Sequence, residues 1–201
     1  MRERIPVVIV LLPVPDGLRM NPKLPFPYSY WAVPGRILAG CCPGSYDPGL
    51  INGQLTGLLD SGVTLVISLM EVAETELFQK FYYTYETVLP GLAKARGHAI
   101  RMERFPIPDR SIPTAEQMTS ILQTIRKELD AGGVIYVHCL GGIGRTGTVI
   151  GCYFVEEGCP NPLEHLQMLT ESEKDYFWPT PQTGEQARFV EDWKERTRSN
   201  C

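Results

Sequence analysis

The sequence predicts an α/β fold in which a central, mostly parallel sheet is flanked by helices. Short apolar runs typical of buried strands alternate along the chain with longer stretches whose apolar residues have helical spacing. The 201 residues are 43% hydrophobic and 21% charged, which is ordinary for a globular protein and enough for a sizeable core. Because a helix after each strand returns the chain to the same end of the sheet, this alternation favours parallel pairing.

Proline separates the beginning of the chain from the rest. Nine of the 17 prolines fall within the first fifty residues. Proline fixes its backbone angle and has no N–H to donate, so it disfavours helix interiors and central strands. We therefore predict that residues 1–34 are a proline-rich segment that wraps the surface, and that residues 35–201 form one domain.

The first half of that domain is predicted to alternate strand and helix. Residues 37–39 indicate an edge strand, 50–60 a helix, and 63–69 a central strand, because the last run is rich in Val, Ile and Leu. Another strand is expected over residues 99–104, followed by a proline-punctuated loop over 105–113.

Capping signals mark the elements of the second half. Thr114 and Gln117 form a capping box that opens a helix, which ends at Gly132 and Gly133. A buried strand follows over residues 134–137, and an apolar helix begins near residue 146. Proline at the first helical position predicts a helix from residue 162, and a last helix is expected from residue 183.

The loop between the strand at 134–137 and the following helix has the composition of an anion-binding site. Gly141, Gly142 and Gly144 permit backbone angles closed to other residues, so successive N–H groups can turn inward as a concave nest. The remaining loop positions are Leu140 and Ile143. The N-terminus of the helix adds unpaired amides and the positive end of its dipole.

A cysteine and an arginine stand at the two ends of this loop. The guanidinium of Arg145 can hold two phosphate oxygens in a bidentate pair. Cys139 lies at the floor of the nest, where the same donors and dipole would stabilise a thiolate nucleophile. Thr146 is expected to donate its hydroxyl to that sulfur, and His138 to orient backbone carbonyls rather than attack.

The run His138-Cys139-x-x-Gly142-x-Gly144-Arg145-Thr146-Gly147 resembles the signature of cysteine-dependent protein tyrosine and dual-specificity phosphatases. With Pro106-Ile107-x-Asp109 upstream, it resembles most the kinase-associated branch of the dual-specificity enzymes. The resemblance implies a tyrosine phosphatase-like fold and a phosphatase-like catalytic domain over residues 35–201. The structural alternative is that Cys139 is only a small buried hydrophobe at a strand end.

The loop over residues 105–113 resembles the general-acid loop of this family. Asp109 lies thirty residues before Cys139 and is the candidate acid that protonates the leaving oxygen. The alternative is an ordinary turn aspartate, since aspartate is common where prolines interrupt a chain.

Two glutamines near the end resemble the loop that positions water in this family. Gln182 matches the first glutamine of that pattern and Gln186 the second. Thr183 and Gln186 also have the spacing of a capping box, so Gln186 has a purely structural alternative.

The resemblance implies hydrolysis of phosphoproteins, at phosphotyrosine and also phosphoserine or phosphothreonine, through a phosphocysteine intermediate. Activity should peak on the acid side of neutrality, because the thiolate must be ionised while Asp109 is protonated. The alternatives are a phosphatase of phosphoinositides or other non-protein phosphomonoesters and a rhodanese-type sulfurtransferase. Leu140 and Ile143 replace the lysines often found in this loop in inositol lipid phosphatases, which favours phosphoprotein.

We expect neither a cofactor nor a metal, because the three histidines are scattered and no Cys/His cluster has zinc-like spacing. The net charge of −4 and the lack of a basic stripe disfavour nucleic acid and membrane surfaces as partners. A cysteine that works as a thiolate favours a cytoplasmic location. The oligomeric state is left open.

Overall fold

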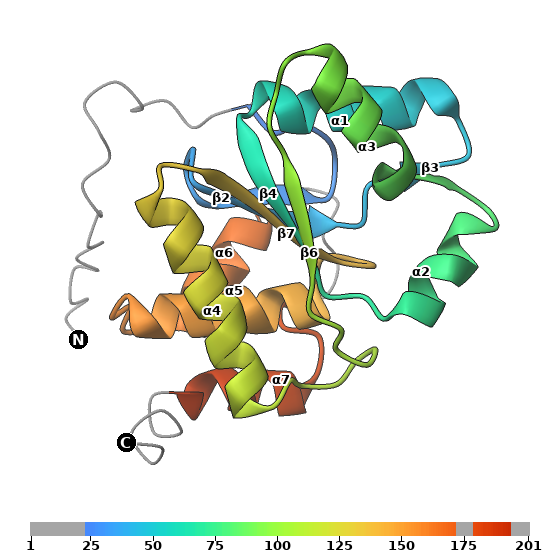
Figure 1. Cartoon of the computed structure of the whole chain (residues 1–201). Helices are drawn as coiled ribbons and strands as arrows, with labels where there is room; N and C mark the ends of the chain where they lie inside the picture. The colour runs from blue at the N-terminus through green and yellow to red at the C-terminus, as the bar shows by residue number, and fades with distance from the viewer. Residues whose placement is uncertain (1–22, 172–178, 194–201) are drawn as a thin grey trace.

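A five-stranded sheet forms the centre of the molecule (Figure 1). The computed structural model describes residues 23–171 and 179–193. In spatial order the strands are β1 (Ser29–Val33), β2 (Ile37–Cys41), β7 (Val134–Cys139), β4 (Val63–Ser68) and β6 (Arg101–Arg104). Only β1 runs antiparallel to its neighbour, and the other pairs are parallel. The predicted mostly parallel α/β fold is confirmed.

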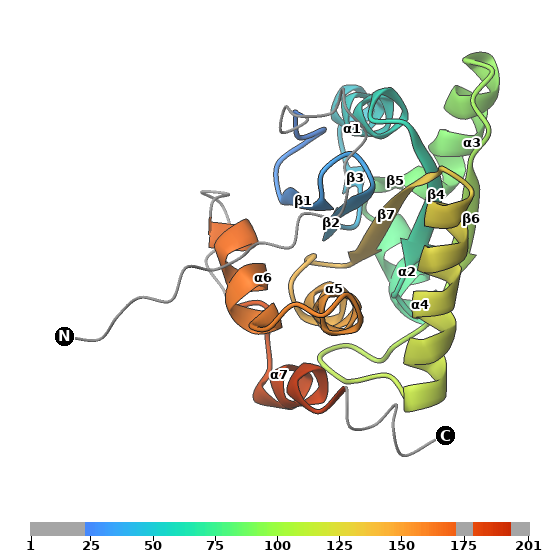
Figure 2. The same cartoon turned by 90° about the vertical axis from the view of Figure 1, so that its left-hand side faces the viewer.

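Helices cover both faces of the sheet (Figure 2). One face is covered by α1 (Pro48–Asp60) and α3 (Tyr85–Ala95), and the other by α4 (Ala115–Asp130), α5 (Gly144–Glu156) and α6 (Pro162–Glu171). The last helix, α7 (Gly184–Glu191), packs against α5 and α6. A short helix, α2 (Val72–Gln79), follows β4, and a small ladder pairs β3 (Gly44–Ser45) with β5 (Tyr83–Thr84).

Alternation along the strands divides the core into two layers. In β7, Ile135 and Val137 are fully buried in the cluster shared with α4 and α5, whereas Tyr136 is buried in the cluster shared with α1 and α3. With apolar residues on both faces, β7 is a central strand. Cys139 lies at the carboxyl end of this strand, and ligands of open α/β sheets bind outside the carboxyl ends of the strands.

Part of the proline-rich beginning belongs to the sheet, so the prediction of an irregular segment over residues 1–34 is wrong for 29–33. The run Ser-Tyr-Trp-Ala-Val is aromatic and β-branched, and it buries Tyr30 and Trp31. Pro27 and Pro34 flank this strand instead of interrupting it. As a result β2, predicted as an edge strand, lies between β1 and β7. Residues 1–22 lie outside the described part of the chain.

Helices α2 and α3 were not predicted from the sequence. Helix α2 buries only Thr75, so it has no apolar stripe from which helical spacing could be recognised. Helix α3 contains Pro90, which in the sequence suggests a break. No helix within the described ranges has the length and apolar character needed to cross a membrane.

Candidate active site

The nucleophile candidate sits where β7 ends and the glycine-rich loop begins. Cys139 is the last residue of β7 and is 3% exposed. Within the described ranges, the backbone N–H groups of residues 140–143 donate no hydrogen bond to another backbone group. The loop leads into the N-terminus of α5, which adds more unpaired amides. The predicted strand, loop and helix are thus in place, with free donors beside the sulfur.

The loop glycines serve two different needs. Only Gly142 has a positive φ, of 74°, and a side chain there would meet the backbone of Gly40 at 2.3 Å. Gly144 has an ordinary backbone conformation, and its lack of a side chain leaves room for Gln186. A Cβ added at Gly144 would lie 3.0 Å from Gln186 Oε1. The expectation that all three glycines supply unusual angles is wrong, since Gly141 also has an ordinary backbone, and a Cβ there would meet only Ile143 Cδ1 at 3.9 Å.

Arg145 is buried and held by several acceptors. It is 2% exposed, and its Nη1 and Nη2 donate to the two carboxylate oxygens of Glu74 at 2.7 Å each. Nη1 also donates to the carbonyl of Ile107 at 3.0 Å. Burial alone would lower the pKa of Arg145, but its hydrogen bonds to Glu74 and the charges of Cys139, Glu74 and Asp109 raise the pKa overall. The guanidinium is therefore a permanent, oriented cation next to the loop.

Glu74 is the functional residue that the sequence analysis missed. It lies in the first turn of α2, and its Oε2 also accepts from the backbone N–H of Glu71 at 3.4 Å. A bidentate carboxylate fixes the plane of the guanidinium. The available signal was an acidic residue shortly after a buried strand, at the carboxyl edge of a parallel sheet.

We expect Glu74→Gln to lower kcat/KM for phosphomonoesters by about 10- to 100-fold, because a misplaced catalytic group costs that much even without its removal. The neutral amide offers one acceptor oxygen where the carboxylate offers two, so Arg145 loses its fixed plane. Steady-state kinetics beside Glu76→Gln, an exposed glutamate on the same helix, checks the prediction. Equal activity of the two variants would contradict it.

The acid loop is tied down at its base and exposed at its tip. Phe105 N donates to Ser68 O at 2.9 Å, and Ile107 N donates to Leu69 O at 3.1 Å. The side chain of Gln117 donates to Pro106 O at 2.8 Å. Asp109 is 65% exposed, yet its Oδ1 lies 3.0 Å from Arg145 Nη2. The structure thus brings the predicted acid to the arginine that is predicted to bind phosphate.

The two glutamines lie beside the start of α5. A Cβ on Gly144 would stand 3.3 Å from Gln182 Cβ, so Gln182 borders the start of α5, and its role in positioning water stays a prediction. Gln186 is fully buried, and its Oε1 accepts from Thr183 N at 3.1 Å, which confirms the capping box. Its Nε2 donates to Ser111 O at 3.0 Å. Gln186 therefore has the capping role that its spacing from Thr183 predicted, and it also holds the acid loop through Ser111.

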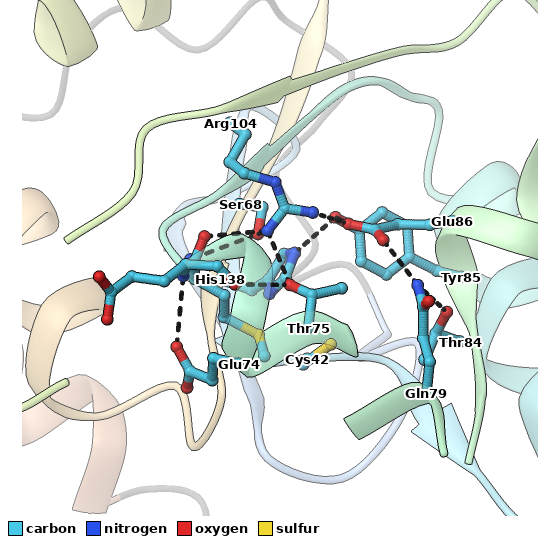
Figure 3. A network of polar contacts seen from close by, with 12 residues as sticks. Cys42, Ser68, Glu74, Thr75, Gln79, Thr84, Tyr85, Glu86, Arg104 and His138 are labelled. Atoms are coloured by element: carbon cyan, nitrogen blue, oxygen red, sulfur yellow. Dashed lines mark hydrogen bonds and ion pairs between the residues drawn. The ribbon is translucent and has the colours of Figure 1, made fainter. Parts of the chain in front are cut away.

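His138 orients the backbone of the nucleophile, as expected. It is 1% exposed, with Nδ1 3.1 Å from Cys139 O and Nε2 3.0 Å from the hydroxyl of Tyr85 (Figure 3). Because a carbonyl can only accept, the consistent tautomer carries its proton on Nδ1 and accepts from Tyr85 at Nε2. Burial lowers the pKa of His138 to about 4, against the opposing effect of its bond to Cys139 O.

This buried histidine should make stability fall with acid. Between about pH 6.5 and pH 4 the unfolded chain binds a proton that the folded chain excludes, so the free energy of unfolding decreases as the pH drops. The loss from this one residue should approach about 3 kcal/mol at pH 4. Urea unfolding at several pH values measures how the free energy of unfolding changes with pH. This dependence should be weaker for His138→Gln than for the wild type, whereas His165→Gln, at a half-buried histidine, should change it less. Parallel profiles for wild type and His138→Gln would contradict this.

Thr146 and two neighbouring cysteines complete the surroundings. Thr146 is fully buried in the first turn of α5, and its Oγ1 has no hydrogen-bond partner in the described part of the chain, so the expected bond to Cys139 sulfur is not formed.

Cys41 lies directly opposite Cys139 in the parallel ladder, and Cys42 N donates to Leu140 O at 3.0 Å. Burial first, and the charge of Cys139 second, raise the pKa of Cys41 to about 12. Cys41 therefore stays a neutral thiol beside the loop.

The sequence of this chain matches the model of a known protein family. The sequence model of the family PTP-SAK, described as "Swiss Army Knife protein, DSP-PTPase phosphatase domain", matches residues 27–189. The chain belongs to this phosphatase family. The match spans the sheet, the nucleophile loop, the acid loop and the glutamine segment, and it confirms the predicted family.

Curated relatives of this phosphatase include two named enzymes. Phosphatidylglycerophosphate phosphatase PTPMT2 of Arabidopsis thaliana is 30% identical over 138 residues, which are 67% of this chain and 51% of that protein. The tyrosine-protein phosphatase CDC14 homolog of Schizosaccharomyces pombe is 33% identical over 128 residues, 64% of this chain and 21% of that protein. Two uncharacterized Methanocaldococcus jannaschii proteins, MJECL20 and MJ0215, are each 35% identical over 56% and 50% of their lengths. The chain thus spans about half the length of these archaeal relatives.

Solved structures show the same fold. Kinase associated phosphatase, with its catalytic cysteine changed to serine, has a TM-score of 0.66 at 14% identity and covers 89% of this chain and 98% of that one. Tk-PTP in its active form has a TM-score of 0.60 at 23% identity, covering 85% and 99%. PTPMT1 in complex with PI(5)P has a TM-score of 0.62 at 18% identity, covering 87% and 99%. At these identities the likeness concerns the fold alone.

Proposed function

We propose that this phosphatase hydrolyses phosphomonoesters through a phosphocysteine intermediate on Cys139. One observation carries the proposal: a buried cysteine stands beside unpaired loop amides and a buried arginine that holds the predicted acid, Asp109, at 3.0 Å. Nucleophile, anion donors and acid are the three components that such a displacement needs.

In the first step, the thiolate of Cys139 attacks phosphorus and the bond to the ester oxygen breaks. Asp109 gives its proton to that oxygen, while the loop amides and Arg145 hold the phosphate oxygens. In the second step, a water positioned by Gln182, which borders the start of α5, attacks phosphorus and gives a proton to Asp109, while the S–P bond breaks and Cys139 leaves as a thiolate. Inorganic phosphate leaves, and both the thiolate and the protonated acid are restored. Neither step requires a metal or a cofactor.

The proposed substrate is a phosphoprotein, at phosphotyrosine and at phosphoserine or phosphothreonine. The loop side chains are Leu140 and Ile143, so no lysine is present there to bind a second phosphate group of a polyanionic lipid. Tyr82 is exposed in the turn between α2 and β5, and Tyr83 is exposed in β5. The ring centroids of Tyr46 and Tyr82 are 6.3 Å apart. These rings offer an uncharged surface beside the elements that carry Glu74.

A second candidate is the hydrolysis of a phospholipid or another non-protein phosphomonoester. It is supported by the name of the Arabidopsis thaliana relative, a phosphatidylglycerophosphate phosphatase, and by the lipid bound in the PTPMT1 structure. A rhodanese-type sulfurtransferase is less well supported, because sulfur transfer has no use for an acid such as Asp109. A cytoplasmic location remains part of the proposal, because reducing conditions keep the Cys139 thiolate that the reaction needs.

The test is phosphate release from matched phosphotyrosine and phosphothreonine peptides, a phosphoinositide and phosphatidylglycerophosphate, without added metal. We expect release from both peptides by the wild-type chain and none by Cys139→Ser. Release from the lipids alone would replace the phosphoprotein assignment by the second candidate. Release that survives Cys139→Ser, or thiosulfate turnover without any phosphate release, would overturn the proposed chemistry.

A further inference from the structure

Arg104 joins four segments beneath the active site. It is the last residue of β6, directly before the acid loop. Its Nη1 donates to Met70 O at 2.9 Å and to Thr75 Oγ1 at 2.7 Å, and its Nη2 forms an ion pair with Glu86 (Figure 3). Met70 follows β4, Thr75 belongs to α2, and Glu86 lies in the first turn of α3. One guanidinium therefore links the end of β4, α2 and α3 to the start of the acid loop.

Helix α2 is held by few apolar contacts, so the polar contacts of Arg104 matter for its position. Thr75 is the only buried residue of this helix, Phe78 is half-buried against the core, and Val72 and Leu77 are each 57% exposed. A helix with one partly buried apolar anchor gains little from the hydrophobic effect. The bond from Arg104 to Thr75 therefore fixes the helix at the residue next to Glu74, whose carboxylate orients Arg145.

A second branch of the same network reaches the nucleophile. Glu86 accepts from Gln79 Nε2 at 3.0 Å, and its Oε1 lies 3.3 Å from the hydroxyl of Tyr85. Because that hydroxyl gives its single proton to His138, the contact between Glu86 and Tyr85 is one of proximity only. His138 in turn contacts the carbonyl of Cys139. Arg104 is thus linked by hydrogen bonds to the Arg145 end of the loop, whereas at the Cys139 end the network has only the contact between Glu86 and Tyr85.

From these contacts we infer that Arg104 is a positioning residue for phosphate binding, acting through Thr75 and Glu74 on Arg145. The inference rests on the proposed role of Arg145 as the phosphate ligand. An ordinary structural ion pair is the competing explanation. The side chains of Arg104 and Glu86 are only 25% and 22% exposed, so loss of Arg104 should also lower the stability of the fold. A purely structural pair would leave the anion affinity of the folded protein unchanged, and this is the quantity that separates the two explanations.

The first test is the dissociation constant of tungstate, an inorganic phosphate mimic, measured by calorimetry. Arg104→Met and Thr75→Val should each weaken tungstate binding, by about tenfold or more for Arg104→Met, because Arg145 loses its fixed orientation. Thr75→Val removes one hydroxyl with little change of shape, so it carries the test if Arg104→Met does not fold. Arg96→Met, which removes an exposed pair with Asp60 on another part of the surface, should bind tungstate as the wild type does.

The second test is a double-mutant cycle on kcat/KM for p-nitrophenyl phosphate, which can be followed over several orders of magnitude. If Arg104 acts through Glu74, then Arg104→Met or Thr75→Val should cause little further loss in the Glu74→Gln background. Additive losses, or unchanged tungstate binding in both single variants, would overturn the inference. A wild type that binds tungstate but hydrolyses no phosphomonoester would instead refute the proposed function, and the tungstate comparison would still decide the role of Arg104.

Discussion

Replacing Arg145 by lysine should lower kcat by about a thousandfold or more, the range known for arginines that stabilise a transferring phosphoryl group. Lysine keeps the positive charge but has a single nitrogen, so it cannot bind both oxygens of Glu74 and at the same time present donors to phosphate. The loss should appear in kcat and in tungstate affinity together, because the bidentate contact is made both to bound phosphate and in the transition state. Single-turnover kinetics with an aryl phosphate is the measurement.

The control for this change is Arg96→Lys, at an exposed ion pair away from the loop. It should retain wild-type kinetics. Because Arg145 is buried, its lysine variant should also lose thermal stability, and kcat must be compared at a temperature where circular dichroism shows both proteins folded. A folded Arg145→Lys variant with activity within a few-fold of wild type would refute the assignment of Arg145 to transition-state stabilisation.

Replacing Asp109 by asparagine should lower kcat by about 10²- to 10⁴-fold for alkyl phosphates such as a phosphothreonine peptide. The loss should be much smaller for p-nitrophenyl phosphate, whose leaving group needs little protonation. Tungstate should bind more tightly, because Asp109 no longer occupies Nη2 of Arg145.

Asp109 is 65% exposed, so its replacement should leave the fold intact. Asp60→Asn, at another exposed ion pair, is the matched control. Equal losses for the alkyl and the aryl substrate would show that Asp109 does not act as the general acid. Weaker tungstate binding would show that its contact with Arg145 helps anions bind instead of competing with them.

Local signals predicted the core of the site. The loop at residues 139–145 could be foreseen because strand, glycine turn and helix N-terminus are adjacent in sequence, and the same holds for the acid loop and the Thr183 capping box. Even here one detail required the structure. Gly144 is small because Gln186, more than forty residues later, packs against it.

The missed parts of the site depend on tertiary contacts between distant segments. Glu74 contacts Arg145 across 71 residues of sequence, from a helix without an apolar stripe. In the tyrosine cluster at residues 82–85, Tyr82 and Tyr83 are exposed while Tyr85 is buried against His138, a difference that β5 and the start of α3 impose. For β1, the prolines on either side obscured a strand whose own residues favour extended structure.

The central claim, that Cys139 carries the phosphoryl group, is tested most directly by trapping the intermediate. Wild-type protein should be mixed with excess substrate, quenched in acid within milliseconds, digested and analysed by mass spectrometry. The peptide that contains Cys139 should gain the mass of one phosphoryl group, and Gln182→Ala should increase the trapped fraction because water is less well placed for the second step. Phosphate release with no phosphorylated Cys139 peptide in either protein, or a phosphoryl group on another residue, would contradict the mechanism.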